Sequence, residues 1–123
     1  MNIIIIDYGM GNLKSIYSAF KYLNVDSISL SNKYDEIKMA DKLLLPGVGS
    51  YAKAMNQIKH LELDKILNEV VLEDNKPLLG ICLGMQLLTN SSDEDGGAEG
   101  LGYIDAKCKR FQCENLKVPH VGF

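Results

Sequence analysis

The amino-acid sequence predicts an α/β fold, with three layers (α/β/α) around a mostly parallel sheet and a flavodoxin-like core. Three apolar runs lack the alternation of half-exposed strands and therefore predict strands buried on both faces; they are residues 2–7, 42–45 and 78–82. Between them, apolar residues recur every three or four positions, which indicates helices. Strands and helices that alternate in this way form a parallel sheet joined by right-handed crossovers and covered on both faces.

The first strand, residues 2–7, ends in a glycine-containing turn, and a helix follows it. Asn12 is a suitable N-cap for this helix because its side chain can accept a hydrogen bond from a free backbone N–H of the first turn. Residues 25–30 then alternate like a short strand, and residues 34–39 predict a short helix. The apolar stripe of the first helix consists of Leu13, Ile16, Tyr17, Phe20 and Leu23.

The apolar run at residues 42–45 is interrupted by Pro-Gly-Val-Gly at 46–49, which indicates a junction between a strand and a loop. Ser50 can cap a helix that extends to about Ile58, and residues 63–72 repeat the helical pattern. Further along, the sequence predicts these elements: a buried strand at 78–82, a helix at 83–88, a loop at 91–102, a strand within 101–111 and an extended segment at 118–123.

The composition of the 123 residues is typical of one globular domain, with 46% hydrophobic and 24% charged residues. A net charge of −3 provides no basic surface for phosphates, so nucleic acid is not an expected partner. The N-terminal apolar run at residues 3–6 is too short for a signal sequence or a membrane span. Three scattered cysteines suit a reducing compartment, and the cytoplasm is the expected location.

The strongest local signal is Gly-Ile-Cys-Leu-Gly at residues 80–84, where a predicted strand meets a predicted helix. In this context the pattern predicts a nucleophile elbow, in which Cys82 has a strained backbone and its sulfur points outward. Glycine is needed two residues on either side because side chains at Gly80 and Gly84 would collide with their surroundings. The N-terminus of the helix would favour the thiolate and supply an oxyanion donor.

Simpler interpretations stay open at this point. Free cysteine is often buried, so Cys82 could be a small core residue. Gly47 and Gly49 could be ordinary turn glycines after a strand. They could equally form a flexible backbone segment at the carboxyl edge of the sheet, where ligands usually bind and where an N–H could face an oxyanion.

Five segments resemble, in order and spacing, the glutaminase subunits of imidazole glycerol phosphate synthases, which are class I glutamine amidotransferases. The segments are Tyr-Gly-Met-Gly-Asn at 8–12, Leu-Pro-Gly-Val-Gly-Ser at 45–50, Gly-Ile-Cys-Leu-Gly-Met-Gln at 80–86, Glu-Gly-Leu-Gly at 99–102 and Pro-His-Val-Gly at 119–122. The resemblance spans the whole chain. It implies the class I amidotransferase fold, with residues 1–123 as the N-terminal part of a single domain.

The same resemblance implies a reaction and a partner. L-Glutamine would be hydrolysed through a cysteine thioester without a cofactor or metal. The ammonia would pass to a (β/α)8 cyclase that makes imidazole glycerol phosphate in histidine biosynthesis. Cys82 would be the nucleophile, and Val48 and Leu83 would offer backbone N–H groups to the oxyanion. The positions that match glutamine-binding residues are Gly47, Gly49, Gln86 and Glu94, and those that match residues facing the synthase are Asn12 and Phe123.

Two features depart from the family pattern. The family completes its catalytic triad with a His and a Glu located C-terminal to the Pro-His-x-Gly segment, and the family gives neither His60 nor His120 that role. The 123-residue chain by itself is therefore expected to be inactive. Phe123 stands where the histidine-biosynthesis members usually carry Trp. An amidotransferase subunit that supplies an amino-sugar synthase for surface polysaccharide is thus an alternative.

Two further alternatives belong to other classes. A flavodoxin-like binding module would use Gly9 and Gly11 to hold a phosphate at the start of the following helix, although Lys14 occupies the place of the third glycine of a dinucleotide fingerprint. A metal site would use Cys108, Cys113 and His120, with loose spacing and no fourth ligand.

Overall fold

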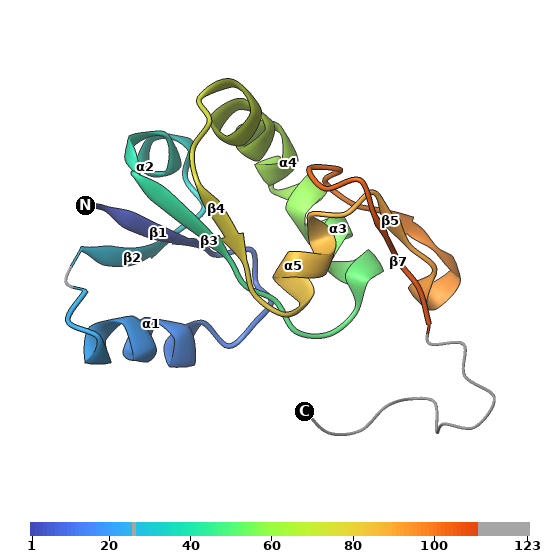
Figure 1. The fold of residues 1–123 in the computed structure, drawn as a ribbon, viewed down its shortest axis with the longest axis horizontal. Helices are drawn as coiled ribbons and strands as arrows, with labels where there is room; N and C mark the ends of the chain where they lie inside the picture. Colours follow the sequence, from blue (N-terminus) through green and yellow to red (C-terminus); the bar gives the residue numbers. More distant parts are fainter. Residues whose placement is uncertain (26, 111–123) are drawn as a thin grey trace.

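The computed structural model describes residues 1–25 and 27–110 (Figure 1). Within them, helices lie on both faces of a four-stranded parallel sheet, and a small second sheet follows in the chain (Figure 1). This arrangement confirms the predicted α/β/α fold. None of the described helices is long and apolar enough to cross a membrane.

The parallel sheet has the strand order β2-β1-β3-β4, which is how a flavodoxin-like sheet begins. Because all pairs are parallel, the carboxyl ends of neighbouring strands meet at one edge, and the loops that follow β1, β3 and β4 leave the sheet side by side. Leu44 pairs with Ile5 on one side, and Leu45 pairs with Gly80 on the other. The strands are β1 (Ile3–Ile6), β2 (Ile28–Ser31), β3 (Lys42–Leu45) and β4 (Leu78–Gly80).

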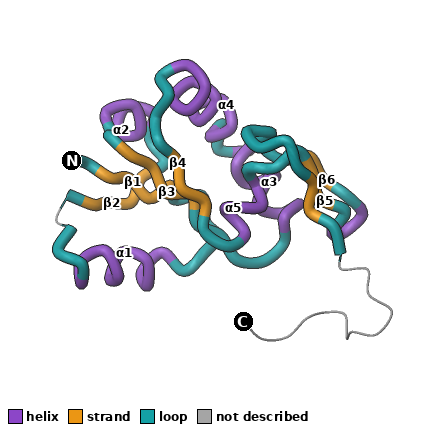
Figure 2. Tube along the Cα trace, in the orientation of Figure 1, coloured by secondary structure: helices purple, strands orange, loops and turns teal. Residues whose placement is uncertain are grey.

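The helices are divided between the two faces of the sheet (Figure 2). One helix covers the first face, namely α1 (Leu13–Tyr22). The opposite face carries α2 (Tyr34–Met39), α3 (Tyr51–His60), α4 (Leu63–Leu67) with a π-helical continuation (Asn68–Glu73), and α5 (Leu83–Leu87).

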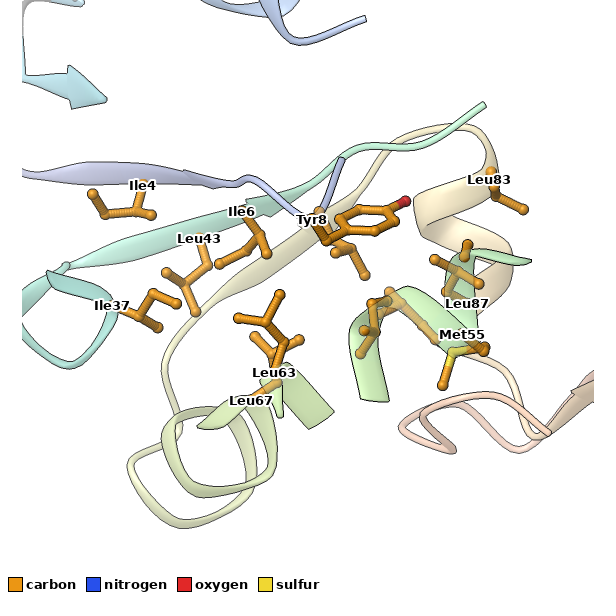
Figure 3. Close-up of a cluster of buried hydrophobic side chains, with 14 of the residues drawn as sticks. Ile4, Ile6, Tyr8, Ile37, Leu43, Met55, Leu63, Leu67, Leu83 and Leu87 are labelled. Atoms are coloured by element: carbon orange, nitrogen blue, oxygen red, sulfur yellow. The ribbon is translucent and has the colours of Figure 1, made fainter. Parts of the chain in front are cut away.

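The four isoleucines of β1 explain why this strand shows no alternation in sequence. Ile4 and Ile6 belong to the large cluster on the side of α2 to α5 (Figure 3), whereas Ile3 and Ile5 pack with α1. All four are buried. A strand in the middle of a sheet that is covered on both faces needs apolar side chains at every position.

Both predicted helix caps are confirmed. The side chain of Asn12 accepts a hydrogen bond from the backbone N–H of Ser15, with an N···O distance of 3.3 Å. Ser50 accepts from the backbone N–H of Lys53 at the same distance. Each cap satisfies one of the N–H groups that the first turn of a helix leaves without an intrahelical partner.

The strand predicted at residues 78–82 is shorter and less buried than expected. β4 ends at Gly80, and 57% of Leu79 is exposed. The prediction of full burial was wrong here because β4 is an edge strand of the described sheet, and the space between Leu79 and Phe20 of α1 is an open hollow. An apolar run indicates burial only where both faces are covered.

Two other segments differ from the sequence-based expectation. The helix at residues 63–72 is α-helical only to Leu67 and then continues as the π-helix. The segment 91–102, predicted as a loop, contains two antiparallel strands, β5 (Ser91–Ser92) and β6 (Ala98–Glu99), and a 3₁₀ turn (Glu94–Gly96). The expected strand within 101–111 is represented by β7 (Lys107–Cys108), parallel to β5. The extended segment predicted at 118–123 lies outside the described residues.

Candidate functional site

Cys82 lies in the turn between β4 and α5, and its side chain is exposed. Its backbone has φ 55° and ψ −120°, a positive φ that residues other than glycine rarely adopt. Such strain persists only where the surrounding structure imposes it. The interpretation of Cys82 as a buried core residue is therefore wrong, and the geometry of a nucleophile elbow is present.

The two glycines that flank Cys82 are required by contacts with backbone. A Cβ atom on Gly80 would lie 2.6 Å from Cα of Met85 and 2.7 Å from its nitrogen. A Cβ atom on Gly84 would overlap the carbonyl oxygen of Leu45. Backbone cannot move aside as the end of a flexible side chain can, so both positions require glycine for the turn to close.

The loop at residues 46–49 lies directly against the Cys82 turn. The backbone N–H of Ile81 donates to the carbonyl oxygen of Leu45, with an N···O distance of 3.0 Å. The N–H of Leu83 donates to the carbonyl oxygen of Gly47 at 3.1 Å. The structure thus brings together the two glycine-containing loops that the sequence placed at separate strand ends.

The Leu83–Gly47 hydrogen bond bears on the two predicted oxyanion donors. A trans peptide directs its C=O and its N–H to opposite sides. Because the Gly47–Val48 peptide directs its oxygen at Leu83, its N–H points away from Leu83. In this conformation the N–H groups of Val48 and Leu83 do not converge on one point. Gly49, at the end of the loop, has φ +108°.

The buried side chain of Tyr8 forms a hydrogen bond with this loop. Its ring is 1% exposed, and its hydroxyl donates to the carbonyl oxygen of Pro46 with an O···O distance of 2.6 Å. Figure 3 shows the ring at the end of β1, with the hydroxyl directed toward the α5 side near Leu83. Burial raises the pKa of Tyr8 to about 12, so the hydroxyl remains a donor at neutral pH.

The sequence interpretation placed Tyr8 in a turn and assigned it no role. One signal was present in the sequence: a tyrosine directly after a buried strand needs a partner for its hydroxyl. That partner, Pro46, lies 38 residues further along the chain. The pattern alone therefore could not identify it.

A hollow of about 490 Å³ opens on one side of α5. It brings together Gln86 and Glu94, two of the predicted glutamine-binding residues. The lining residues are Gln86, Ser92, Asp93, Glu94, Cys108, Lys109 and Arg110. Cys82 is not one of them; it directly precedes α5, and Gln86 lies about one helical turn into that helix.

The hollow has acidic and basic parts. Asp93 and Glu94 contribute carboxylates, whereas Lys109 and Arg110 contribute cations. A free amino acid carries one ammonium and one carboxylate group, and this combination of charges can bind both. Lys109 and Arg110 were not identified from the sequence. They follow β7, whose two residues are too few to predict where the chain runs.

One wall of the hollow is tied to α5 through Thr89. The hydroxyl of Thr89 donates to the backbone oxygen of Gln86, with an O···O distance of 2.6 Å. Its oxygen also lies 3.5 Å from Sγ of Cys108 and 3.3 Å from the hydroxyl oxygen of Tyr51. These contacts fix β7 and α3 against the helix that carries Gln86.

The remaining predicted residues are dispersed or lie outside the described residues. Asn12 caps α1, and His60 is the exposed last residue of α3. Phe123, His120 and Cys113 lie outside the described part of the chain. Within residues 1–25 and 27–110, no group of three or more His, Cys, Asp or Glu side chains could hold a metal ion. The proposed set of Cys108, Cys113 and His120 falls largely outside these ranges.

The glycine turn after β1 contacts its neighbouring loop. The N–H of Gly9 donates to Oδ1 of Asp7, with an N···O distance of 3.3 Å. A Cβ atom on Gly11 would lie 3.3 Å from Cα of Gly47. This close approach to Gly47 explains a glycine at position 11 by packing alone, without a bound phosphate.

Comparisons with known proteins show the family of the chain. Residues 4–120 match the family "Glutamine amidotransferase class-I". The chain is 50% identical, over 98% of its length and 59% of the relative, to imidazole glycerol phosphate synthase subunit HisH 2 of Methanococcus maripaludis. It is 45% identical, over 97% of its length and 58% of the relative, to subunit HisH of Bacillus subtilis. The chain thus spans about three fifths of the length of these curated relatives.

A solved structure shows the same fold. It is described as a crystal structure of glutamine amidotransferase, and it aligns with a TM-score of 0.71 at 18% sequence identity. The alignment covers 87% of this chain and 56% of that one. The two chains therefore share the same overall fold.

Proposed function

Because the chain belongs to the class I glutamine amidotransferase family, we propose that it carries the nucleophile of a glutaminase site. The reaction is hydrolysis of L-glutamine to glutamate and ammonia, and the chain is the N-terminal part of one amidotransferase domain. The observation that carries this proposal is the turn at Cys82, where an exposed sulfur stands on a strained residue between β4 and α5. That conformation serves to present a nucleophile.

The chemistry follows from the nature of the thiol. The Cys82 thiolate attacks the carbon of the glutamine side-chain amide and forms a C–S bond. The C–N bond breaks, ammonia leaves with a proton from a general acid, and a thioester remains. Water then attacks the thioester, which releases glutamate and returns the thiol. The proton carrier is the histidine that the family places C-terminal to residue 120.

Stabilisation of the oxyanion requires one change in the loop at 46–49. A half-turn of the Gly47–Val48 peptide would release the Leu83 N–H from the oxygen of Gly47 and direct the Val48 N–H to the same side. Both donors would then face the developing negative charge. Glycine at 47 and 49 gives this peptide its freedom to rotate, since glycine accepts both signs of φ.

Glutamine recognition is assigned to the hollow beside α5. Gln86 and Glu94 would bind the ammonium end of the substrate, and the cationic pair Lys109 and Arg110 would attract its carboxylate. The side-chain amide would then extend along α5 toward Cys82. The mixture of charges favours an amino acid over a purely anionic or purely apolar ligand.

The relatives' names suggest where the ammonia goes. They are subunits of imidazole glycerol phosphate synthase, so a (β/α)8 cyclase of histidine biosynthesis is the proposed partner in a cytoplasmic heterodimer, with Asn12 and Phe123 facing it. A second candidate partner is an amino-sugar synthase. Phe123, in place of the usual Trp, favours this alternative.

The test uses the full natural polypeptide together with a cyclase partner, with release of glutamate as the measurement. Cys82→Ala should reduce the rate at least about a thousandfold, since the nucleophile is lost. Met85→Ala is the matched control because Met85 is exposed on the same helix, and its rate should stay within about twofold. Hydrolysis that survives Cys82→Ala would refute the assignment.

A further inference from the structure

We propose that Tyr8 is a positioning residue for the oxyanion loop: its hydroxyl anchors the carbonyl of Pro46, so that only the next peptide, Gly47–Val48, can turn. This inference rests on the proposed glutaminase function. It adds a residue to which neither the sequence pattern nor the comparisons assign a role.

The side chain of Tyr8 is itself held rigidly. Its ring belongs to the large buried cluster, between the end of β1 and the start of α5 (Figure 3). Leu83, the residue after the nucleophile, belongs to the same cluster. A hydroxyl on a ring that is held in this way has little freedom to follow a moving partner, and it therefore holds its acceptor in place.

The acceptor of the Tyr8 hydroxyl, Pro46, has little conformational freedom of its own. The proline ring fixes φ of Pro46, so the orientation of the Pro46–Gly47 peptide depends on ψ of Pro46, and a hydrogen bond to the Pro46 carbonyl holds that angle. That carbonyl accepts the Tyr8 hydroxyl at 2.6 Å. A Cβ atom on Gly47 would overlap the same hydroxyl. Tyr8 thus lies against Pro46 and Gly47, the two residues on the N-terminal side of the bond that rotates.

Two successive carbonyl groups of the loop are held by different partners. The oxygen of Pro46 is held by a buried side chain, whereas the oxygen of Gly47 is held by the Leu83 N–H at 3.1 Å. The second hydrogen bond must break if Leu83 is to serve an oxyanion, but the first need not. The loop is thus anchored at Pro46, while the Gly47–Val48 peptide can rotate. The motion is limited to this peptide, which carries the Val48 N–H donor.

Loss of the hydroxyl should therefore affect the reaction step more than substrate binding. With Pro46 released, the Val48 donor would no longer be directed to a single position. Loss of a whole oxyanion donor lowers kcat by about 10²–10³, so its misplacement should lower kcat by about tenfold or more. Gln86 and Glu94, the proposed glutamine-binding residues, line a hollow of which Tyr8 is not a lining residue, so KM should change by less than about twofold.

The experiment compares Tyr8→Phe with Tyr103→Phe in the full natural polypeptide bound to its cyclase partner, with kcat and KM for glutamine hydrolysis as the readout. Tyr103 is the matched control because its hydroxyl also donates one hydrogen bond, to Oδ1 of Asn68 at 2.7 Å, away from the Cys82 turn. The expected result is a loss of kcat at constant KM in Tyr8→Phe, with both parameters retained in Tyr103→Phe.

Three results would overturn the inference, and they are distinguishable. An unchanged kcat in Tyr8→Phe would refute the positioning role while the glutaminase function stands. An equal loss of kcat in both variants would show a structural effect only. No hydrolysis by the unsubstituted complex would refute the proposed function and the positioning role with it.

Gly47→Ala keeps the proposal testable if Tyr8→Phe does not fold. Its methyl group would displace the Tyr8 hydroxyl from Pro46 and would also lie 3.1 Å from the backbone nitrogen of Gly84 and from Cβ of Leu83. It should therefore lower kcat at least as much as Tyr8→Phe. A Gly47→Ala variant with unchanged kcat would contradict the anchoring of this loop.

Discussion

The two faces of the parallel sheet are covered very differently. Among residues 1–25 and 27–110, seventeen buried residues form one continuous cluster on the face of α2 to α5. On the other face, four buried residues of the same ranges form the core under α1, and α1 has no buried residue. An apolar hollow of about 200 Å³ lies beside this smaller core, next to Phe20 and Leu79.

The candidate site is built on the well-packed face. Tyr8 and Leu83 belong to its cluster, and Gly84 packs against the backbone of β3. A strained residue such as Cys82 can persist only where neighbours leave it no alternative. The comparison therefore indicates that the dense packing on this face maintains the geometry of the nucleophile, whereas the face of α1 contributes little to it.

Among substitutions on the well-packed face, Gly84→Ala should lower the free energy of unfolding most. Its Cβ would overlap the carbonyl oxygen of Leu45, so β3 or α5 would have to move. We expect the free energy of unfolding to fall by at least about 3 kcal/mol, measured by urea denaturation. Gly96→Ala is the control: it meets open space and should cost only about 1 kcal/mol, from its φ of +87°. Equal losses in both variants would mean that Gly84 is not closely packed.

A pair of leucines compares the two faces directly. Leu87→Ala creates a cavity in the large cluster and should lower the free energy of unfolding by about 2–5 kcal/mol. Leu79→Ala, on the open face, should cost less than about 1 kcal/mol, since 57% of Leu79 is exposed in the 123-residue chain. Denaturation of the two variants of this chain checks the difference. Similar costs would show that the faces are equally packed.

Alkaline pH gives a smaller and graded effect on the packed face. The pKa of Tyr8 is raised by burial from 10.0 to about 12. The folded state therefore disfavours the phenolate: the stability that this group contributes is complete below pH 10 and is lost as the pH rises from 10 to 12. The loss should reach at most about 2.7 kcal/mol. Denaturation across this range should show a weaker pH dependence in Tyr8→Phe, and an unchanged dependence would contradict the raised pKa.

Much of the fold could be predicted because its signals are local. The bounds of α2 and β3, the caps at Asn12 and Ser50, and the turn at Cys82 all depend on residues within a few positions of one another. Glycine two residues before and after a cysteine at a strand end is specific enough to predict a backbone conformation. The match of these segments to a known family extended the prediction from conformation to chemistry.

The features that escaped prediction depend on partners distant in sequence. Strands of two residues in the small sheet are too short for any periodicity to indicate them. The exposure of Leu79 depends on what covers the sheet, not on the strand itself. The bond from Tyr8 to Pro46 and the contact of Leu83 with Gly47 join loops that meet only because three parallel strands end at one edge.

The central claim is that Cys82 is a glutaminase nucleophile, and covalent labelling tests it most directly. The full natural polypeptide is incubated with a glutamine-like diazo ketone, and the adduct is located by intact mass and peptide mapping. We expect one label per chain on Cys82, slower labelling when glutamine is present, and the same label on Cys82 in Cys108→Ser. Absence of a label, or a label on Cys108 or Cys113 with Cys82 unmodified, would contradict the account.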